Sequence, residues 1–192
     1  AYYQTRDEQL LRVIEPRMQA IGANEFGQYL THIRGNPTEV EGIVNRLTVG
    51  ETYFFRDRYQ FKALAEVAFP DISRRAANGM ARAWSAGCSI GAEPYSLACL
   101  AWRHPNLVPG LSILATDINV EALEIARARC FSEWALCDVS PVERQLYFDY
   151  HERGWMIRSQ FAQAVAFEYH NLVRDPIPPQ GQPYDLILCR NV

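Results

Sequence analysis

The strongest constraint on the fold is a strand–loop–helix–strand pattern that begins near residue 81. An apolar run, ARAWSA (81–86), leads into the small-residue loop GCSIG (87–91), and AEPYSLACLAWR (92–103) then has helical apolar spacing. A second apolar run, LSILAT, ends at Asp117 and is followed by another helical pattern (119–130). Strands that alternate with helices favour an α/β fold with a parallel sheet and helices on its faces. Two later runs are also predicted to be strands: AVAFEYH (164–170) and YDLILCR (184–190).

The first 48 residues have a different pattern, with apolar residues spaced as in three short amphipathic helices. Gly22 is placed to end the first helix, and Asn36 followed by Pro37 is typical of the start of the third. A further helix is expected at about 59–69, before the polar stretch ISRRAANG. The predicted organisation is a helical domain (1–48), a linker and interdomain segment (49–74), and an α/β domain (75–192) with a small antiparallel subdomain within about 145–170.

Composition excludes several classes of protein. The net charge of −3 gives no reason to expect binding to nucleic acid or to an anionic membrane. No apolar run approaches the roughly 20 residues of a transmembrane helix, and the N-terminus has no signal-peptide pattern. The five cysteines form no C-x-x-C pair, which argues against a structural metal site or a disulfide framework. We therefore expect no metal and a cytoplasmic location with free thiols.

The candidate ligand site lies where the predicted strands end. In an open parallel sheet, ligands bind beyond the carboxyl ends of the strands. Gly87 and Gly91 would let the backbone approach a ligand closely, and Asp117 could accept both hydroxyls of a ribose. The loop lacks the G-x-G-x-x-G pattern of dinucleotide enzymes and the lysine of a P-loop. Glu93 would repel a phosphate and attract a cation, so the site suits a positively charged nucleoside such as S-adenosylmethionine. Taken singly, the glycines could serve only a tight turn, and Asp117 only a helix cap.

One alternative is an α/β-hydrolase, because GCSIG also matches the G-x-S-x-G nucleophile elbow. Ser89 would then be the nucleophile. Helices rather than several strands precede the loop, and no HGGG-type oxyanion segment is present. The remaining triad members would have to come from segments that look like strand or irregular structure: Asp149 or Asp117, with His151 or His170.

Five segments, in order, resemble the CheR family of chemotaxis-receptor glutamate methyltransferases. They are TVGETYFFRD (48–57), WSAGCSIGAEPYSLA (84–98), ATDIN (115–119), the pair Asn171–Leu172, and YDLILCRNV (184–192). The N-terminal helices also resemble that family's small helical domain. The resemblance implies a class I S-adenosylmethionine-dependent methyltransferase (Rossmann-like) sheet, with S-adenosylhomocysteine as product. The family pattern continues beyond CRNV, so the last strands of the sheet are expected to be missing from this sequence.

The resemblance also implies site residues and a partner. Arg56 and Arg190 match residues that reach the active site, and guanidinium groups are suited to orienting a carboxylate. An ionised glutamate needs no general base to accept a methyl group. The implied partner is the cytoplasmic domain of a methyl-accepting chemoreceptor, and further C-terminal interaction domains occur in some relatives. The implied cofactor contacts are Thr52, Arg56, Ala86, Gly87, Glu93, Asp117, Ile118, Asn171, Leu172, Arg190 and Asn191.

Two departures from the family pattern bear on the site. Gly50 stands where many members have Asn, and Ala92 replaces the first acid of the usual G-E-E-P, which leaves Glu93 alone. Residues 1–62 contain equal numbers of acidic and basic groups, so electrostatic docking on an acidic receptor is not predicted. Because the last strands of the family pattern are expected to be missing from this sequence, a module that binds the cofactor and signals without catalysis is kept as an alternative function.

Overall fold

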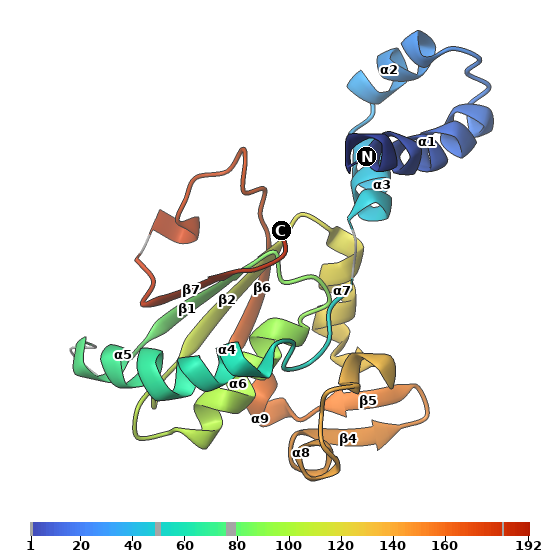
Figure 1. Cartoon of the computed structure of the whole chain (residues 1–192). Coiled ribbons are helices and arrows are strands. Elements are labelled where there is room, and N and C mark those ends of the chain that lie inside the picture. Colours follow the sequence, from blue (N-terminus) through green and yellow to red (C-terminus); the bar gives the residue numbers. More distant parts are fainter. Residues whose placement is uncertain (1, 49–50, 76–79, 182) are drawn as a thin grey trace. The chain divides into compact units, whose positions relative to one another are not determined.

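The chain forms two units, which divide at residue 49 and are described separately (Figure 1). The structure is a computed structural model that describes residues 2–48, 51–75, 80–181 and 183–192. No helix in these ranges is long and apolar enough to span a membrane.

The first unit consists of the three predicted helices. Gly22, with a φ of 70°, follows the first of them, as expected for a residue without a Cβ after a helix end. The Asn36 side chain accepts the backbone N–H of Glu39, which confirms the predicted N-cap. The bounds are α1 (Tyr2–Ala20), α2 (Phe26–Arg34) and α3 (Pro37–Leu47).

A polar cluster ties these three helices together. Arg17 of α1 donates two hydrogen bonds to the Glu39 carboxylate, at 2.6 and 2.9 Å, and the Tyr29 hydroxyl of α2 donates a third at 2.5 Å. These donors, with the Arg17 bonds contributing most, lower the pKa of Glu39 to about 2. A Cβ at Gly42 would meet the Arg17 guanidinium, so a larger residue there would require the end of the Arg17 side chain to move.

The second unit is built on a four-stranded parallel sheet, which confirms the predicted α/β class (Figure 1). The spatial order is β6-β2-β1-β7, with every neighbouring pair parallel. Along the chain, β2 and then β6 are added on one side of β1, and β7 is added on its other side. The strand order therefore reverses between β1 and β7, where α/β folds place their ligands. The strands are β1 (Arg82–Ala86), β2 (Ser112–Asp117), β6 (Val165–Tyr169) and β7 (Leu186–Cys189).

The described helices of this unit cover one face of the sheet, whereas the sequence led us to expect helices on both faces. Helices α6 (Ala92–Arg103) and α7 (Val120–Ala128) pack on the face that carries Ala83 and Ile113 of the central strands. On the other face, Trp84 and its neighbours are covered by Leu172 and Tyr184 from the segment between β6 and β7, which contains the short turn η3 (Pro179–Gly181). Ile187 and Cys189 of β7 share that second face and are exposed.

The segment predicted as a linker is largely helical. Helix α4 (Arg58–Ala63), a π-helical stretch η1 (Leu64–Ala68) and α5 (Phe69–Arg75) follow one another without a break. Their Phe61, Phe69 and Ile72 are buried in the core of the second unit. The helical segment begins at Arg58, one residue before the predicted start, and ends at Arg75 instead of 69. The C-terminal extension buries Ile72 in the core.

A second, antiparallel sheet is inserted between α7 and β6. Its order is β3-β5-β4, and its outer strand β3 comes from earlier in the chain than the predicted window of 145–170. Within that window, β6 belongs to the parallel sheet instead. Ser140 and Glu143 form a capping box at the start of α8. The elements of this region are β3 (Cys130–Phe131), η2 (Trp134–Leu136), α8 (Pro141–Tyr147), β4 (Phe148–His151), β5 (Gly154–Ile157) and α9 (Ser159–Ala162).

Candidate functional site

The loop between β1 and α6 is held in a tight conformation at the carboxyl end of the sheet. Gly87, Ser89 and Gly91 all have positive φ, at 76°, 49° and 87°. The N–H groups of Gly87 and Cys88 both donate to the Thr116 carbonyl of β2, at 2.8 and 2.9 Å. A Cβ at Gly91 would lie 2.9 Å from Ala126 Cβ and 3.1 Å from the Phe167 ring, so α6 and α7 pack closely only because this residue is glycine.

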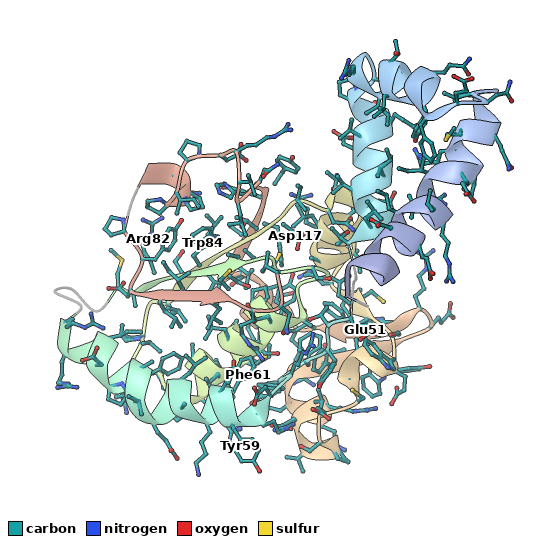
Figure 2. All side chains as sticks on the ribbon, turned by 45° about the horizontal axis from the view of Figure 1, so that its top comes forward. Glu51, Tyr59, Phe61, Arg82, Trp84 and Asp117 are labelled. Atoms are coloured by element: carbon teal, nitrogen blue, oxygen red, sulfur yellow. The ribbon has the colours of Figure 1, made fainter. Side chains whose placement is uncertain are left out.

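Asp117 ends β2 and organises this loop. Its Oδ2 accepts the Ser89 N–H at 2.7 Å, and its Oδ1 accepts the Asn119 N–H at 2.8 Å. Asp117 and Arg82 mark opposite ends of the parallel sheet in Figure 2. Each carboxylate oxygen has a second lone pair, which leaves capacity to accept the two hydroxyls of a ribose.

Glu93, in the first turn of α6, is a half-buried acid with a cationic partner. Its Oε1 accepts the Ser85 hydroxyl at 2.8 Å, and its Oε2 accepts Arg190 Nη1 at 3.1 Å. The side chains of Glu93 and Arg190 are only 12% and 16% exposed. Burial raises the pKa of Glu93, while the bonds from Ser85 and Arg190 act in the opposite direction. A carboxylate in such surroundings is stabilised by a positive charge beside it.

The segment that carries Arg56 is anchored from two directions. The Phe54 N–H donates to the Ala135 carbonyl at 2.8 Å, and the Phe55 N–H donates to the Ser96 hydroxyl of α6 at 2.9 Å. The Phe54 ring packs edge-on between Phe131 and Phe148 of the antiparallel region, with centroids 4.8 Å apart in each case. The aromatic contacts described here lie within the second unit. They fix the backbone from which Arg56 projects.

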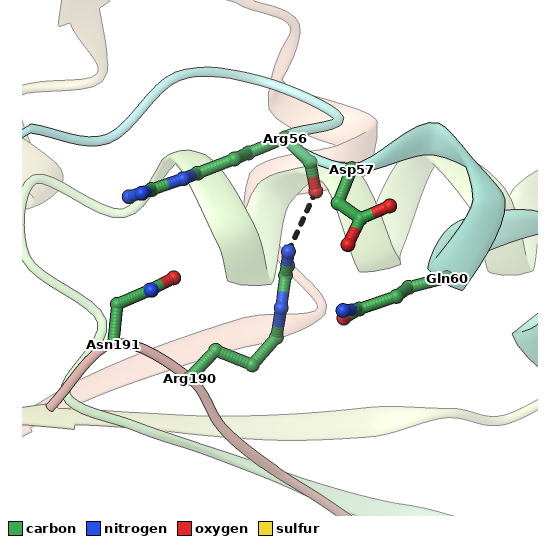
Figure 3. A pocket seen from close by; sticks show the side chains of 5 residues that line it. All are labelled: Arg56, Asp57, Gln60, Arg190 and Asn191. Atoms are coloured by element: carbon green, nitrogen blue, oxygen red, sulfur yellow. Dashed lines mark hydrogen bonds between the residues drawn. The ribbon is translucent and has the colours of Figure 1, made fainter.

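Arg56 and Arg190 meet at a pocket of about 350 Å³ (Figure 3). Arg190 Nη2 donates to the carbonyl oxygen of Arg56 at 2.8 Å. The guanidinium of Arg56 donates to the Glu51 carbonyl at 2.6 Å and lies on the Asn191 side of the pocket in Figure 3. Arg56 thus binds a carbonyl oxygen, and Arg190 pairs with Glu93. The pocket is lined by Arg56, Asp57, Gln60, Arg190 and Asn191.

Asn171 and Leu172 follow β6 at the same end of the sheet. Asn171 Oδ1 accepts the Val173 N–H at 2.9 Å, and its own N–H donates to Asp175 at 2.7 Å. Leu172 packs on the cluster of Trp84 and its neighbours. These bonds make an ordered turn of the pair. The turn lies next to the end of β2, because the N–H of the preceding His170 donates to the Asp117 carbonyl at 3.1 Å.

The remaining sequence-predicted residues are placed along the same edge or beside it. Ala86 ends β1 and is buried, and Ile118 follows β2 and is half-buried. Thr52 is half-buried and precedes the anchored aromatic segment. Gly50 lies outside the described residues, and Ala92 is fully buried, where a larger acid would meet the core. The structure thus brings strand ends and helix starts together, while the role of each residue stays a prediction.

Sequence reasoning missed several residues of this site. Asp57 and Gln60 line the pocket, Ser85 binds Glu93, and Ser96 holds the segment before Arg56. The sequence did carry a signal for Ser96, because a serine in the middle of an otherwise apolar helix needs a hydrogen-bond partner. The same signal was present for Ser85, a hydroxyl in a strand predicted to be buried, but the sequence did not identify Glu93 as its partner.

The hydrolase alternative is not supported by the positions of its triad. Ser89 has the positive φ of a nucleophile elbow, but Asp117 binds its backbone N–H. Asp149 pairs with Arg158, and His151 lies in β4 of the antiparallel sheet. The ring of His170 packs on Trp84, with Nδ1 3.9 Å from Asp175. The candidate acids and histidines therefore have other partners or belong to the other sheet.

The loop between β1 and α6, Asp117 at the end of β2 and Glu93 in α6 lie at the carboxyl edge of the parallel sheet, and their carboxylate acceptors are of the kind that would suit a cationic nucleoside such as S-adenosylmethionine. Among the described residues, no cluster of His, Cys, Asp or Glu could hold a metal ion. A family model described as the SAM-binding domain of CheR methyltransferase matches residues 50–192. The chain belongs to the CheR methyltransferase family, and S-adenosylmethionine is the cofactor of the domain it carries.

Curated relatives agree with this assignment. The chemotaxis protein methyltransferase of Salmonella typhimurium is 36% identical over 183 residues, which cover 92% of this chain and 61% of the relative. The protein of the same name from Escherichia coli is 34% identical, over 92% of this chain and 62% of its own length. An uncharacterised 104.1 kDa protein of Rhodobacter capsulatus is 33% identical, over 94% of this chain but only 19% of its own length. The chain thus spans about three fifths of the first two relatives.

Proposed function

We propose that the protein containing this chain transfers a methyl group from S-adenosylmethionine to glutamate side chains in the cytoplasmic domain of a chemoreceptor. The observation that carries the proposal is the arrangement around Glu93. Its carboxylate is buried near the ends of the central strands and is joined through Arg190 to a pocket that also contains Arg56. The Glu93 carboxylate suits a cation, and the adjoining pocket with Arg56 and Arg190 suits an anion.

Each group has a role in this scheme. Asp117 accepts the ribose hydroxyls, and Glu93 attracts the cationic portion of the cofactor. Arg56 and Arg190 orient the acceptor carboxylate, which is ionised at neutral pH because its pKa is ordinarily about 4.3. When bound, S-adenosylmethionine supplies an activated methyl group whose transfer to a carboxylate oxygen gives a methyl ester. Catalysis by the chain's own residues is then alignment and exclusion of water, and no proton needs to be removed.

The direct test is transfer of labelled methyl from S-adenosylmethionine to a purified receptor cytoplasmic domain. We expect label that is released as methanol in mild base, as for a glutamate methyl ester, and no label on a receptor whose candidate glutamates are replaced by alanine. Base-stable label would indicate a different acceptor atom. Binding of S-adenosylhomocysteine without any transfer, in the full-length protein with several receptors, would instead favour a cofactor-binding module that signals without catalysis.

A further inference from the structure

Arg190 stands between the two halves of the site. One guanidinium nitrogen, Nη1, donates to Glu93, and the other, Nη2, donates to the Arg56 carbonyl. The same side chain lines the pocket beside Gln60 and Asn191 (Figure 3). An arginine has five N–H donors, and these two bonds leave others for a ligand in the pocket.

The charge of Arg190 is nevertheless shared. In the structure it offsets the carboxylate of Glu93, whose side chain is 12% exposed and has Ser85 as its other partner. A second carboxylate that enters the pocket must compete with Glu93 for one positive charge. Arg56 makes no direct contact with Glu93 in the part of the chain that the structure describes: its guanidinium donates to the Glu51 carbonyl, a neutral group, although its positive charge also acts on Glu93 as the last of the causes that lower the pKa of that acid.

We infer that Arg190 couples the two ligand sites, so that a cofactor whose ammonium group pairs with Glu93 frees the charge of Arg190 for the acceptor carboxylate. The inference rests on the proposed function, because it takes the cation beside Glu93 and the carboxylate beside Arg190 from that scheme. It goes beyond that function by predicting that the two ligands bind with positive cooperativity. By linkage, each ligand then strengthens binding of the other by the same factor.

The test compares the affinity of an acceptor peptide with and without cofactor. A labelled peptide with blocked ends and a single glutamate is titrated into the protein alone, with saturating S-adenosylhomocysteine, and with saturating 5′-methylthioadenosine. The last compound keeps the nucleoside and thioether but lacks the whole amino-acid portion, both its ammonium and its carboxylate, so the Glu93→Gln variant is what assigns the effect to the ammonium. We expect S-adenosylhomocysteine to tighten peptide binding about 5- to 20-fold, within the usual range for coupled sites, and methylthioadenosine to leave it unchanged. The same peptide with glutamine in place of glutamate measures binding that does not depend on the carboxylate.

Variants identify the residues responsible. In Glu93→Gln the counter-charge of Arg190 is removed, so peptide binding should be tight without cofactor and the enhancement should fall to about onefold. Gln60→Ala is the matched control, because Gln60 lines the same pocket and is not the partner of Glu93. Its peptide affinity is free to change, but the 5- to 20-fold enhancement should remain.

The outcomes separate this inference from the proposed function. If S-adenosylhomocysteine binds and peptide affinity is unchanged or weakened, the coupling is wrong while the cofactor site stands. An equal enhancement by methylthioadenosine, or one retained in Glu93→Gln, would also overturn it. Failure of the wild-type protein to bind S-adenosylhomocysteine would overturn both the coupling and the proposed function. The comparison of the two nucleosides uses only wild-type protein, so it can still overturn the coupling if Glu93→Gln does not fold.

Discussion

Replacing Gly91 by alanine tests whether the close packing of the loop is what positions the site. Gly91 has a φ of 87°, and a Cβ there would meet Ala126 at 2.9 Å and the Phe167 ring at 3.1 Å. The left-handed backbone costs an alanine about 1–2 kcal/mol, and forcing an extra methyl into a packed core costs about 1–3 kcal/mol more. The reduced freedom of the unfolded chain offsets about 0.5 kcal/mol. We therefore expect Gly91→Ala to destabilise the second unit by about 1.5–4.5 kcal/mol.

Gly181→Ala is the matched control for this substitution. Gly181 belongs to the same unit and has a φ of 63°, but no described atom lies within 4 Å of the place its Cβ would take. This variant should therefore show the backbone cost of about 1 kcal/mol without the packing cost. The difference between the two variants isolates the overlap of α6 with α7.

Tryptophan fluorescence during urea unfolding is the assay, because every tryptophan of the chain lies in the second unit. With an m-value of about 2 kcal/mol/M, the packing cost should lower the midpoint of Gly91→Ala by about 0.5–1.5 M relative to Gly181→Ala. Equal midpoints for the two variants would refute the steric argument. The reporting side chains are Trp84, Trp102, Trp134 and Trp155.

Two further predictions concern the anchors of each unit. Glu39→Gln removes the charged partner of Arg17 and should cost the helical unit about 1.5–3 kcal/mol, seen as a loss of helical circular dichroism at lower temperature with no change in tryptophan fluorescence. The pKa of Glu39 lies at about 2, below its ordinary value of 4.5. This stabilisation is therefore present above about pH 4.5 and is lost as the pH falls toward 2. A thermal unfolding midpoint of the helical unit that does not change with pH in that window would contradict this prediction. Ser96→Ala leaves the buried Phe55 N–H without its acceptor and should lower stability by about 1–3 kcal/mol. An unchanged urea midpoint for Ser96→Ala would show that this bond is not needed.

Local sequence patterns predicted the strands and the loop between β1 and α6 because the relevant physics is local. An apolar run of five or six residues that ends in small residues specifies a buried strand and a tight turn. The helix predicted at 59–69 was found, but its continuation through α5 to Arg75 was missed because the π-helical stretch at Leu64–Ala68 interrupts the 3.6-residue spacing and the residues after Ile72 are polar. The position of β3 in the antiparallel sheet was missed because a two-residue strand has no periodicity to detect.

The interactions within the site could be predicted only in part. Asp117 was expected at the end of β2 because its position follows directly from the strand pattern. The ion pair between Glu93 and Arg190 joins residues 97 positions apart, and no pattern in either segment identifies the other as its partner. Only the folded sheet, with β7 beside β1, brings the two side chains together.

The most direct test of the account is calorimetric titration of the chain with S-adenosylhomocysteine, beside an Asp117→Ala variant. Because Asp117 also holds the N–H groups of Ser89 and Asn119, the variant must first show the fluorescence and circular dichroism of a folded protein. The account predicts that the wild-type chain binds the ligand and that the folded variant binds at least tenfold more weakly. Equal binding by both, or no binding by either the chain or the full-length protein, would contradict the assignment of the cofactor site.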